Sequence, residues 1–355
     1  MDLIRLQKSN IRQIITPEEL EKQIPLPFGI INQVNKSRGR ISDIIEGRSR
    51  RILVIVGPCS IHDEKSAIEY AEKLSELSKI YSDDLEIVMR VYFEKPRTRI
   101  GWKGLIYDPY LNESSNFNDG ICIAKRILIN ISKLGLSAGT EFLEPLHANY
   151  LHDLISWGAI GARTTESQLH RQMASSFRFP IGFKNGTNGN VDVAIDAIVS
   201  AASKHTFLSL SRSGTLSEVI SSGNNLGHLI LRGGIKPNYD EISIHKANKS
   251  LRVAEVNQNL LVDCSHGNCQ KNYANQLVVL DELCRQISLG KNYIVGVMLE
   301  SHLEEGSQPI NRLENLKYGQ SITDPCIGWK DTVIALKKLA EASATRSQRK
   351  TIENI

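Results

Sequence analysis

Four cations stand directly after short apolar runs, where their charge could bind an anionic ligand. Arg90 ends the run LEIVMR, Arg163 ends AIGAR, Lys184 ends PIGFK and Arg232 ends LILR. A single such cation is more often a structural ion pair, but four gathered at one site would repel one another unless an anion lay between them. Arginine also suits the paired oxygens of carboxylate and phosphate groups. The four residues therefore predict an anion-binding pocket.

A further basic segment follows Arg90 and extends to Gly104. It reads RVYFEKPRTRIGWKG, and Glu94 is its only carboxylate. Pro96 fixes its own φ and favours an extended residue before it, so we expect a shaped loop rather than a helix. Taken alone, such a segment is more often a solvated surface. Together with the four strand-end cations, it predicts ligands that carry at least two separate anionic groups. The added cations are Lys95, Arg97, Arg99 and Lys103.

Five other polar side chains stand in motifs that could reach the same site. As a set they mix soft and hard metal ligands of the kind that hold Mn, Fe, Co or Zn. Each also has a simpler interpretation, since the cysteine could fill the core, the histidine could be buried and satisfied, and the carboxylates could pair with the arginines. From spacing alone both interpretations stay open. The residues are Cys59 in GPCSIHD, Glu141 in GTEFLEP, His266 in DCSHGN, Glu300 in MLESH and Asp324 in SITDPC.

Nine short apolar, β-branched runs alternate with longer amphipathic stretches, which is typical of repeated βα units around a parallel sheet. The run TFLSL is followed by too few residues for a helical crossover, so we expect it to form a β-ribbon with TLSEVIS near residues 206–222. The other eight predict an α/β (β/α)8 TIM barrel, whose chemistry would lie where the strands end. An open doubly wound sheet is the alternative. The nine runs start at Arg51, Leu85, Leu136, Ile155, Pro180, Thr206, His228, Asn259 and Tyr293.

Three regions are expected along the chain. Residues 1–48 would form an N-terminal extension, with a helix capped by Thr16 and Glu19 and a second helix that ends at Gly47. Residues 49–340 would form the catalytic barrel, and residues 341–355 a polar tail that frays. Apolar positions such as Ile11, Ile14 and Ile15 have no evident partner in a closed barrel, so we expect the chain to self-associate.

Composition excludes several classes of protein. The formal charge of +4 comes from 43 basic and 39 acidic residues, which does not indicate nucleic-acid binding. Residues 1–20 contain no apolar run long enough for a signal peptide, and no later stretch approaches the length of a membrane span, so neither is expected. Its six cysteines are scattered and lack a C-x-x-C pair, so we expect free thiols and a cytoplasmic protein.

Between about residues 10 and 340 the sequence resembles class I 3-deoxy-D-arabino-heptulosonate-7-phosphate (DAHP) synthase, of the bacterial type that includes amino-acid-regulated isoenzymes. The resemblance rests on long motifs in order: GPCSIHD, MRVYFEKPRTRIGWKGL, SWGAIGARTTESQ, GFKNGTNG, ILRGG, DCSHGN, GVMLESHLEEG and YGQSITDPCIGW. It implies a barrel with an N-terminal extension and a β-ribbon. It also implies a metal-dependent condensation of phosphoenolpyruvate with erythrose 4-phosphate, the first step of the shikimate pathway, with release of phosphate.

The resemblance also implies roles for the residues. The ligands of a divalent metal would be Cys59, His266, Glu300 and Asp324. Phosphoenolpyruvate would be bound by Arg90, Lys95, Arg163, Lys184 and Arg232, and the phosphate of the aldose by Arg97 and Thr98. Lys95, with its pKa lowered by the neighbouring arginines, would donate a proton to the new hydroxyl group. Glu141 would orient the attacking water.

In the family, the segment at 144–150 and the ribbon form a feedback site for an aromatic amino acid. This chain carries Ser213 where the phenylalanine-regulated type has an aromatic residue. The resemblance therefore predicts an aromatic amino-acid effector without indicating whether it is Phe, Tyr or Trp.

Three other functions remain open at the level of the sequence. In an imine-forming barrel aldolase, Lys184 would attack a carbonyl substrate. In the sister condensation, arabinose 5-phosphate would replace erythrose 4-phosphate. A sensor of phosphorylated metabolites would bind at the same site without turnover, although that function does not explain the Cys, His, Glu and Asp set.

Overall fold

Eight parallel strands close into a barrel in this computed structural model, which describes residues 11–310 and 313–353. The strand order around the barrel is β1-β10-β9-β8-β5-β4-β3-β2. This arrangement confirms the predicted (β/α)8 barrel, and the alternative of an open sheet is wrong. The barrel strands are β1 (Ile52–Gly57), β2 (Leu85–Arg90), β3 (Ser137–Glu141), β4 (Trp157–Ile160), β5 (Ile181–Lys184), β8 (Gly227–Leu231), β9 (Leu260–Asp263) and β10 (Ile294–Glu300).

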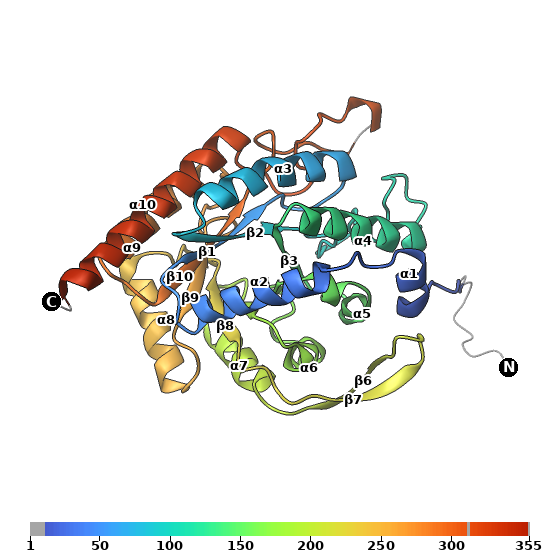
Figure 1. Cartoon of the computed structure of the whole chain (residues 1–355), viewed down its shortest axis with the longest axis horizontal. Coiled ribbons are helices and arrows are strands. Elements are labelled where there is room, and N and C mark those ends of the chain that lie inside the picture. Colours follow the sequence, from blue (N-terminus) through green and yellow to red (C-terminus); the bar gives the residue numbers. More distant parts are fainter. Residues whose placement is uncertain (1–10, 311–312, 354–355) are drawn as a thin grey trace.

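Helices follow the strands and form the outer layer of the barrel (Figure 1). Their inward faces and the outward-facing strand residues make the larger of two hydrophobic cores. The helices are α3 (Glu64–Ile80), α4 (Phe117–Lys133), α5 (Ala148–Leu151) with the short 3-10 turns η1 (Pro145–His147) and η2 (His152–Leu154), α6 (Gln168–Ser176), α7 (Asp192–Ala201), α8 (Glu241–Val253), α9 (Asn275–Ser288) and α10 (Trp329–Glu353), together with the turn η3 (Leu313–Asn315).

A second, smaller core fills the interior of the barrel and continues into the N-terminal extension. Leu53, Trp157 and Met298 from three strands belong to it, and so do Ile41 and Ile45 of helix α2 (Ile30–Ile45). The side-chain amide of Asn259, just before β9, donates to the carbonyl of Ile45 at 2.9 Å. Helix α2 therefore closes the end of the barrel at which the strands begin, and leaves the opposite end for a ligand site.

Helix α1 (Pro17–Gln23) begins with the predicted capping box. The side chain of Thr16 accepts from the backbone N–H of Glu19, and the carboxylate of Glu19 accepts from the backbone N–H of Thr16. Helix α2 ends just before Gly47, as the sequence predicts. The first ten residues of the expected extension lie outside the described residues.

The predicted ribbon is confirmed as an antiparallel pair, β6 (Thr206–Leu210) and β7 (Leu216–Ile220). It stands apart from the barrel and extends toward helix α1 (Figure 1). At its turn, the carbonyl of Arg212 accepts from the backbone N–H of Glu18 at 2.9 Å. The ribbon thereby joins the N-terminal extension to the catalytic barrel.

The C-terminal stretch differs from the expectation that it would fray from residue 341. Helix α10 continues through Glu353. Arg346 is 5% exposed and donates to the carbonyls of Ile294 and Arg50, while Ser343 donates to the carbonyl of Asp84. These contacts tie the polar residues of the helix to loops at the closed end of the barrel, which composition alone could not indicate.

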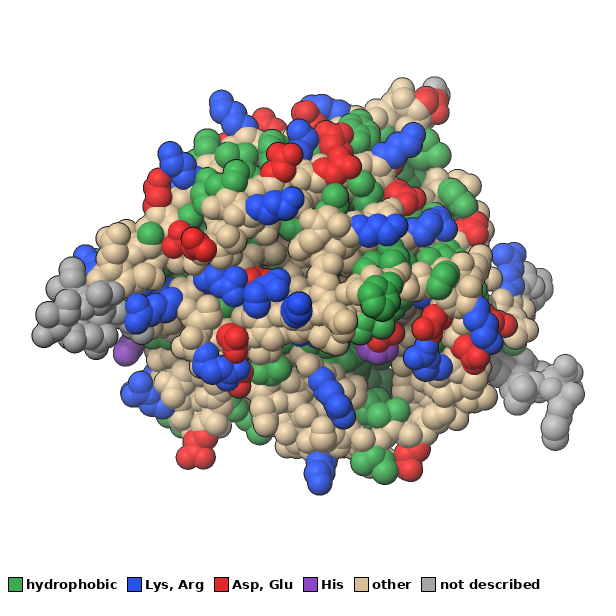
Figure 2. All heavy atoms as spheres, in the orientation of Figure 1, with side chains coloured by type: hydrophobic (Ala, Val, Ile, Leu, Met, Phe, Trp, Pro, Cys, Tyr) green, Lys and Arg blue, Asp and Glu red, His purple; other side chains and the backbone are tan. Residues whose placement is uncertain are grey.

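The surface agrees with the nearly balanced charge. Lys and Arg side chains are interspersed with Asp and Glu over the face shown in Figure 2. Among residues 11–310 and 313–353, no helix is both long and apolar enough to cross a membrane. The cytoplasmic location stays a prediction.

Candidate active site

The predicted site residues gather at the end of the barrel where the strands terminate. Arg90, Lys184 and Glu300 are the last residues of β2, β5 and β10, and Arg232 directly follows β8. Cys59 follows β1 by two residues. Because the strands are parallel and in register, these ends form one rim, which is where (β/α)8 enzymes place their catalytic groups.

Three of the four predicted metal ligands converge. The thiol of Cys59 and carboxylate oxygens of Glu300 and Asp324 all lie within 4.8 Å of one another. The fourth, His266, places its Nε2 3.8 Å from Oε1 of Glu300. Protein ligands bind such metals at about 2.0–2.3 Å, so donor atoms at these separations can surround a single ion. A thiol, an imidazole and two carboxylates are therefore brought to one point by four distant segments.

Asp263, the last residue of β9, was missed at the level of the sequence and holds His266 in place. Its Oδ2 lies 2.9 Å from Nδ1 of His266, and its Oδ1 accepts from the hydroxyl of Ser265. With Nδ1 engaged, Nε2 is the ring nitrogen that faces Glu300 and can bind a metal. His266 adopts φ of +56°, an uncommon backbone conformation for a non-glycine residue. A strained backbone of this kind is typical of functional sites.

Cys59 is fully buried, and its thiol is kept protonated when no metal is bound. Burial, followed by the negative charge of Glu300, raises the pKa of Cys59 to about 12. A bound metal cation would reverse this effect, because coordination deprotonates a thiol outright. The thiol donates a hydrogen bond to Oδ2 of Asp324 at 3.3 Å. The donor set thus fits a divalent ion that supplies the missing positive charge.

Lys95 lies against these ligands, and the prediction about its pKa is wrong. Its ammonium is 3.0 Å from the sulfur of Cys59 and 3.4 Å from Oδ2 of Asp324. Burial lowers the pKa of Lys95, but the acidic groups around it, Cys59 first and then Asp324, outweigh this effect and raise the pKa. The positive charge of Arg90 lowers the pKa of Lys95 only weakly. The closed barrel places Cys59 and Asp324, which are distant in the sequence, against the ammonium of Lys95.

Two of the four strand-end cations are already neutralised by protein carboxylates. Arg90 donates to Oε1 of Glu300 at 2.9 Å, and its guanidinium stacks 3.7 Å from the ring centre of Tyr92. Lys184 donates to Oδ2 of Asp263 at 3.0 Å. The expectation that all four cations need an external anion is therefore wrong for Arg90 and Lys184, which have carboxylate partners across the barrel.

The other two cations have no carboxylate partner among the described residues. Arg163 is exposed, and the guanidinium of Arg232 makes a single long hydrogen bond within the described chain, to the carbonyl of Gly233 at 3.4 Å. Burial lowers the pKa of Arg232, the negative charge of Asp263 opposes this, and the positive charge of Arg163 lowers the pKa further. Two unpaired guanidinium groups that feel each other's charge form a site at which an anion would bind favourably.

A buried asparagine, also missed at the level of the sequence, shapes the loop after Arg232. Asn185 is fully buried, its Oδ1 accepts from the backbone N–H of Arg232 at 2.8 Å, and its amide donates to the carbonyl of Gly233 at 2.8 Å. Gly233 has φ of +73°, and a Cβ there would collide with the backbone of Gly267. The glycine therefore lets the loops after β8 and β9 touch. The motif KNGT, which contains Asn185, was the signal in the sequence that could have identified this residue.

The remaining predicted residues lie at the rim but do not contact the metal ligands in the described structure. Glu141 ends β3, and a Cβ on Gly161 would collide with its carboxylate, so the two loops pack closely. Arg97 and Thr98 are exposed, and Nε of Arg97 donates to the carbonyl of Trp102 at 2.8 Å. The basic loop is thus folded back on itself beside the site.

Comparisons with known proteins agree with this geometry. The model of the DAHP synthetase I family matches residues 19–337. The Trp-sensitive phospho-2-dehydro-3-deoxyheptonate aldolase of Escherichia coli K12 is 50% identical over 341 residues, which cover 96% of this chain and 98% of that protein. The corresponding enzyme of Salmonella typhimurium LT2 is 49% identical with the same coverage.

Comparison of the fold with solved structures agrees with the comparison of sequences. The structure of phospho-2-dehydro-3-deoxyheptonate aldolase from Francisella tularensis SCHU S4 superimposes with a TM-score of 0.93 at 48% identity, and covers 95% of this chain and 98% of that one. Family model, sequence identity and fold all extend over nearly the whole chain. The chain belongs to the DAHP synthetase I family.

Proposed function

We propose that this enzyme condenses phosphoenolpyruvate with erythrose 4-phosphate and water to give DAHP and phosphate. The observation that carries this proposal is the position of a four-residue metal-ligand set beside two arginines that lack a carboxylate partner in the described structure. The metal-ligand set would hold an ion that activates an aldehyde oxygen, and the two arginines would hold a phosphorylated acid next to it.

Cys59, His266, Glu300 and Asp324 would hold a divalent ion, and this mixed donor set suits Mn, Fe, Co or Zn. When bound, such an ion supplies a Lewis acid that polarises the carbonyl oxygen of the aldose. Asp263 keeps the imidazole of His266 oriented toward that position.

The substrates would occupy the cationic part of the rim. Arg163 and Arg232 bind the phosphate or carboxylate of phosphoenolpyruvate, and Arg90 and Lys184 contribute donors while they keep their own carboxylate partners. Arg97 and Thr98 bind the phosphate of the aldose, since both are exposed at the mouth of the barrel. The enol carbon then attacks the aldehyde, water adds at the carbon that carries the phosphate group, and C–O cleavage releases phosphate.

Two residues would move the proton and place the water. Lys95, whose raised pKa keeps it an ammonium, lies 3.0 Å from Cys59 and can donate a proton to the developing hydroxyl group. Glu141 at the end of β3 orients the attacking water.

An aromatic amino acid would regulate the enzyme. Relatives with about half of their residues in common are named Trp-sensitive, so tryptophan is the effector to test first. The segment at 144–150 and the ribbon, which would form the effector region, are linked by a hydrogen bond of 3.3 Å from the amide of Asn149 to the hydroxyl of Ser209. The enzyme would assemble as a homodimer or homotetramer.

A phosphate-release assay tests the activity. Release should require both phosphoenolpyruvate and erythrose 4-phosphate, stop when the metal is chelated, and return when Mn is added. Arabinose 5-phosphate should replace erythrose 4-phosphate poorly. Release that continues undiminished in a chelator, or that prefers arabinose 5-phosphate, would exclude the proposed reaction.

A matched pair of variants tests the pocket. Arg163→Gln removes a charged donor, and hydrogen bonds to charged groups contribute about 1.5–3 kcal/mol, so the KM for phosphoenolpyruvate should rise about 10- to 100-fold. Arg178→Gln, at an exposed arginine away from the rim, should leave this KM unchanged. If Arg163→Gln and Arg178→Gln have the same KM for phosphoenolpyruvate, Arg163 does not bind this substrate.

A further inference from the structure

A buried glutamine on helix α9 holds the main chain of Glu300, one of the proposed metal ligands. Gln276 is 0% exposed. Its side-chain oxygen accepts from the backbone N–H of Glu300 at 2.9 Å, and its amide nitrogen donates to the carbonyl of Glu300 at 3.0 Å. Both polar groups of the side chain therefore bind to the same residue.

The strand next to β10 ends too early to supply these hydrogen bonds. The pairing of β9 with β10 ends at Asp263 and Met298, and Glu300 lies two residues farther along β10. On its other side β10 still pairs with β1, where Glu300 lies opposite Gly57. A side-chain amide offers the same kind of donor and acceptor as a peptide group. Gln276 therefore takes the place of a strand residue beside Glu300 and satisfies its N–H group, which is costly to bury without a partner.

The same glutamine ties the segments of two proposed metal ligands together. His266 lies in the segment between β9 and α9, and Gln276 lies in the first turn of α9, where that segment ends. The hydrogen bonds from Gln276 to Glu300 therefore attach the end of the His266 segment to the end of β10. Nε2 of His266 lies 3.8 Å from Oε1 of Glu300, and this separation depends on where the two main chains lie.

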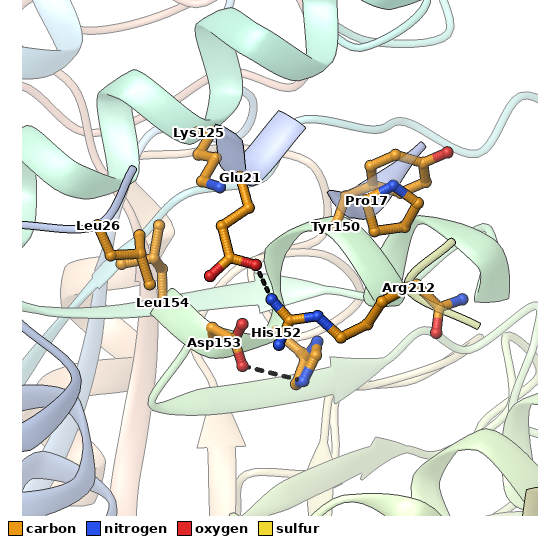
Figure 3. A pocket seen from close by; sticks show the side chains of 10 residues that line it. Pro17, Glu21, Leu26, Lys125, Tyr150, His152, Asp153, Leu154 and Arg212 are labelled. Atoms are coloured by element: carbon orange, nitrogen blue, oxygen red, sulfur yellow. Dashed lines mark ion pairs between the residues drawn. The ribbon is translucent and has the colours of Figure 1, made fainter. Parts of the chain in front are cut away.

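A histidine beside a carboxylate does not by itself gather metal ligands. In the cavity shown in Figure 3, Nε2 of His152 lies 3.0 Å from Oδ1 of Asp153. His266 has a similar contact with Asp263. Within residues 11–310 and 313–353, however, three metal-binding side chains converge at one place only, and that place includes Glu300. The position of Glu300 is therefore what gives His266, unlike His152, a set of neighbouring ligands.

We propose that Gln276 is a positioning residue for the metal site, and that its paired hydrogen bonds to the main chain of Glu300 set the affinity for the divalent ion. This inference rests on the proposed metal-dependent function and adds to it a residue that holds a ligand in place without being one. When the amide is removed, the carboxylate of Glu300 is no longer held near Cys59 and Asp324. Groups that orient the ligands of a metal typically contribute about 10- to 100-fold to its affinity.

Titration of the chelator-treated, full-length enzyme with Co²⁺ tests the proposal. Calorimetry measures the affinity, and the visible absorption of bound Co²⁺ reports the geometry of its ligands. Gln276→Met, which keeps the length of the side chain but removes both hydrogen bonds, should weaken Co²⁺ binding about 10- to 100-fold and change the absorption.

Gln286→Met is the matched control. Gln286 is also 0% exposed on α9, and its amide donates to the carbonyl of Tyr239 at 3.0 Å. Gln286 lies about 15 Å farther along the helix than Gln276. Its replacement should therefore leave Co²⁺ affinity and absorption as in the wild type.

Thermal denaturation of the metal-free proteins shows whether each variant is folded at the temperature of the titration. Saturating Co²⁺ should raise the Tm of the wild type and of Gln286→Met by more than that of Gln276→Met. Gln276→Asn, whose amide is one methylene too short to reach Glu300, gives the same comparison if the methionine variant does not fold.

Two kinds of failure are distinguishable. Unchanged Co²⁺ affinity and absorption in folded Gln276→Met, or an equal loss in Gln286→Met, would overturn the role of Gln276 and leave the proposed metal site in place. A wild-type enzyme that binds no Co²⁺ would overturn the proposed metal site and, with it, the role of Gln276.

Discussion

At the scale of single residues, the site depends on carboxylates that each contact two basic side chains. Asp263 contacts the ammonium of Lys184 and the imidazole of His266, and Glu300 contacts Arg90 and lies near the same imidazole. Burial raises the pKa of Asp263, but His266 and Lys184 outweigh it and hold this pKa well below its usual range. Asp263 therefore remains ionised and links the metal ligands to the substrate cations.

This role predicts the effect of Asp263→Asn. A neutral amide cannot offset the charge of Lys184 and also hold the imidazole of His266 as the carboxylate does. Loss of a group that orients a metal-binding histidine typically weakens metal affinity by about 10- to 100-fold. Metal titration of the chelator-treated enzyme measures this affinity. Asp281→Asn, at an exposed carboxylate of α9 that pairs with Lys338, should leave it unchanged. An unaltered metal affinity in Asp263→Asn would show that His266 is oriented by other contacts.

Lys184 distinguishes the metal-dependent reaction from an imine mechanism. Its side chain is 4% exposed and its Nζ donates to Asp263, so the nitrogen is already engaged and does not face a carbonyl substrate. Borohydride added during turnover should therefore leave both the mass of the protein and its activity unchanged. A substrate adduct at Lys184 in a peptide digest would establish the imine route instead.

The sequence predicted which residues reach the rim, but not how they pair. Arg90, Lys184 and Arg232 could be recognised because each ends an apolar run. The partners could not, because the contact between Lys184 and Asp263 joins strands whose neighbours are fixed only when the barrel closes. The sequence also predicted a lowered pKa for Lys95, whereas this pKa is raised. Asp324, which contributes to the rise, is 229 positions away along the chain.

At the scale of elements, a buried histidine inside the barrel links stability to pH. Nε2 of His228 in β8 accepts from the indole N–H of Trp157 in β4 at 3.1 Å, and its Nδ1 lies 3.1 Å from the carbonyl of Leu226. This arrangement requires the neutral ring, and burial lowers the pKa of His228 to about 4. The folded state therefore resists a proton that the unfolded state, with an ordinary pKa of about 6.5, takes up readily.

Stability should consequently fall as the pH drops from about 6.5 toward 4, and His228 adds no further change outside this window. At pH 5 the expected penalty is about 2 kcal/mol relative to neutral pH. Urea unfolding of the wild type and of His228→Gln at pH 7 and pH 5 isolates the contribution, since the other titrating groups are common to both. A pH dependence that is the same in the two proteins would contradict this account.

The elements themselves were largely predictable, because their signals are local. All eight barrel strands are fully or almost fully buried runs, and the helix at Pro17 is set by a capping box within four residues. The end of α10 was not predictable. Its polar residues gain carbonyl partners, such as Ile294 for Arg346, from parts of the chain that only the closed barrel brings near.

At the scale of the whole molecule, the ribbon exposes apolar surface that one chain does not cover. Leu208, Leu216 and Ile220 share one face of it and are 69%, 71% and 74% exposed. An isolated two-stranded ribbon is at best marginally stable in water, and large apolar side chains exposed together on one face often mark an interface between subunits. The face therefore supports the expectation that the chain self-associates.

A charged double variant tests this expectation. Light scattering on the eluting peak of a size-exclusion column should give the wild type a mass that is a multiple of the single chain. Leu208→Lys combined with Ile220→Lys places two ammonium groups on the ribbon face and should shift the mass toward the single chain at low concentration. Val253→Lys, at a residue of α8 that is 76% exposed, should leave the mass unchanged. If the double variant keeps the wild-type mass, the subunits meet elsewhere, and the apolar face of the ribbon has another role.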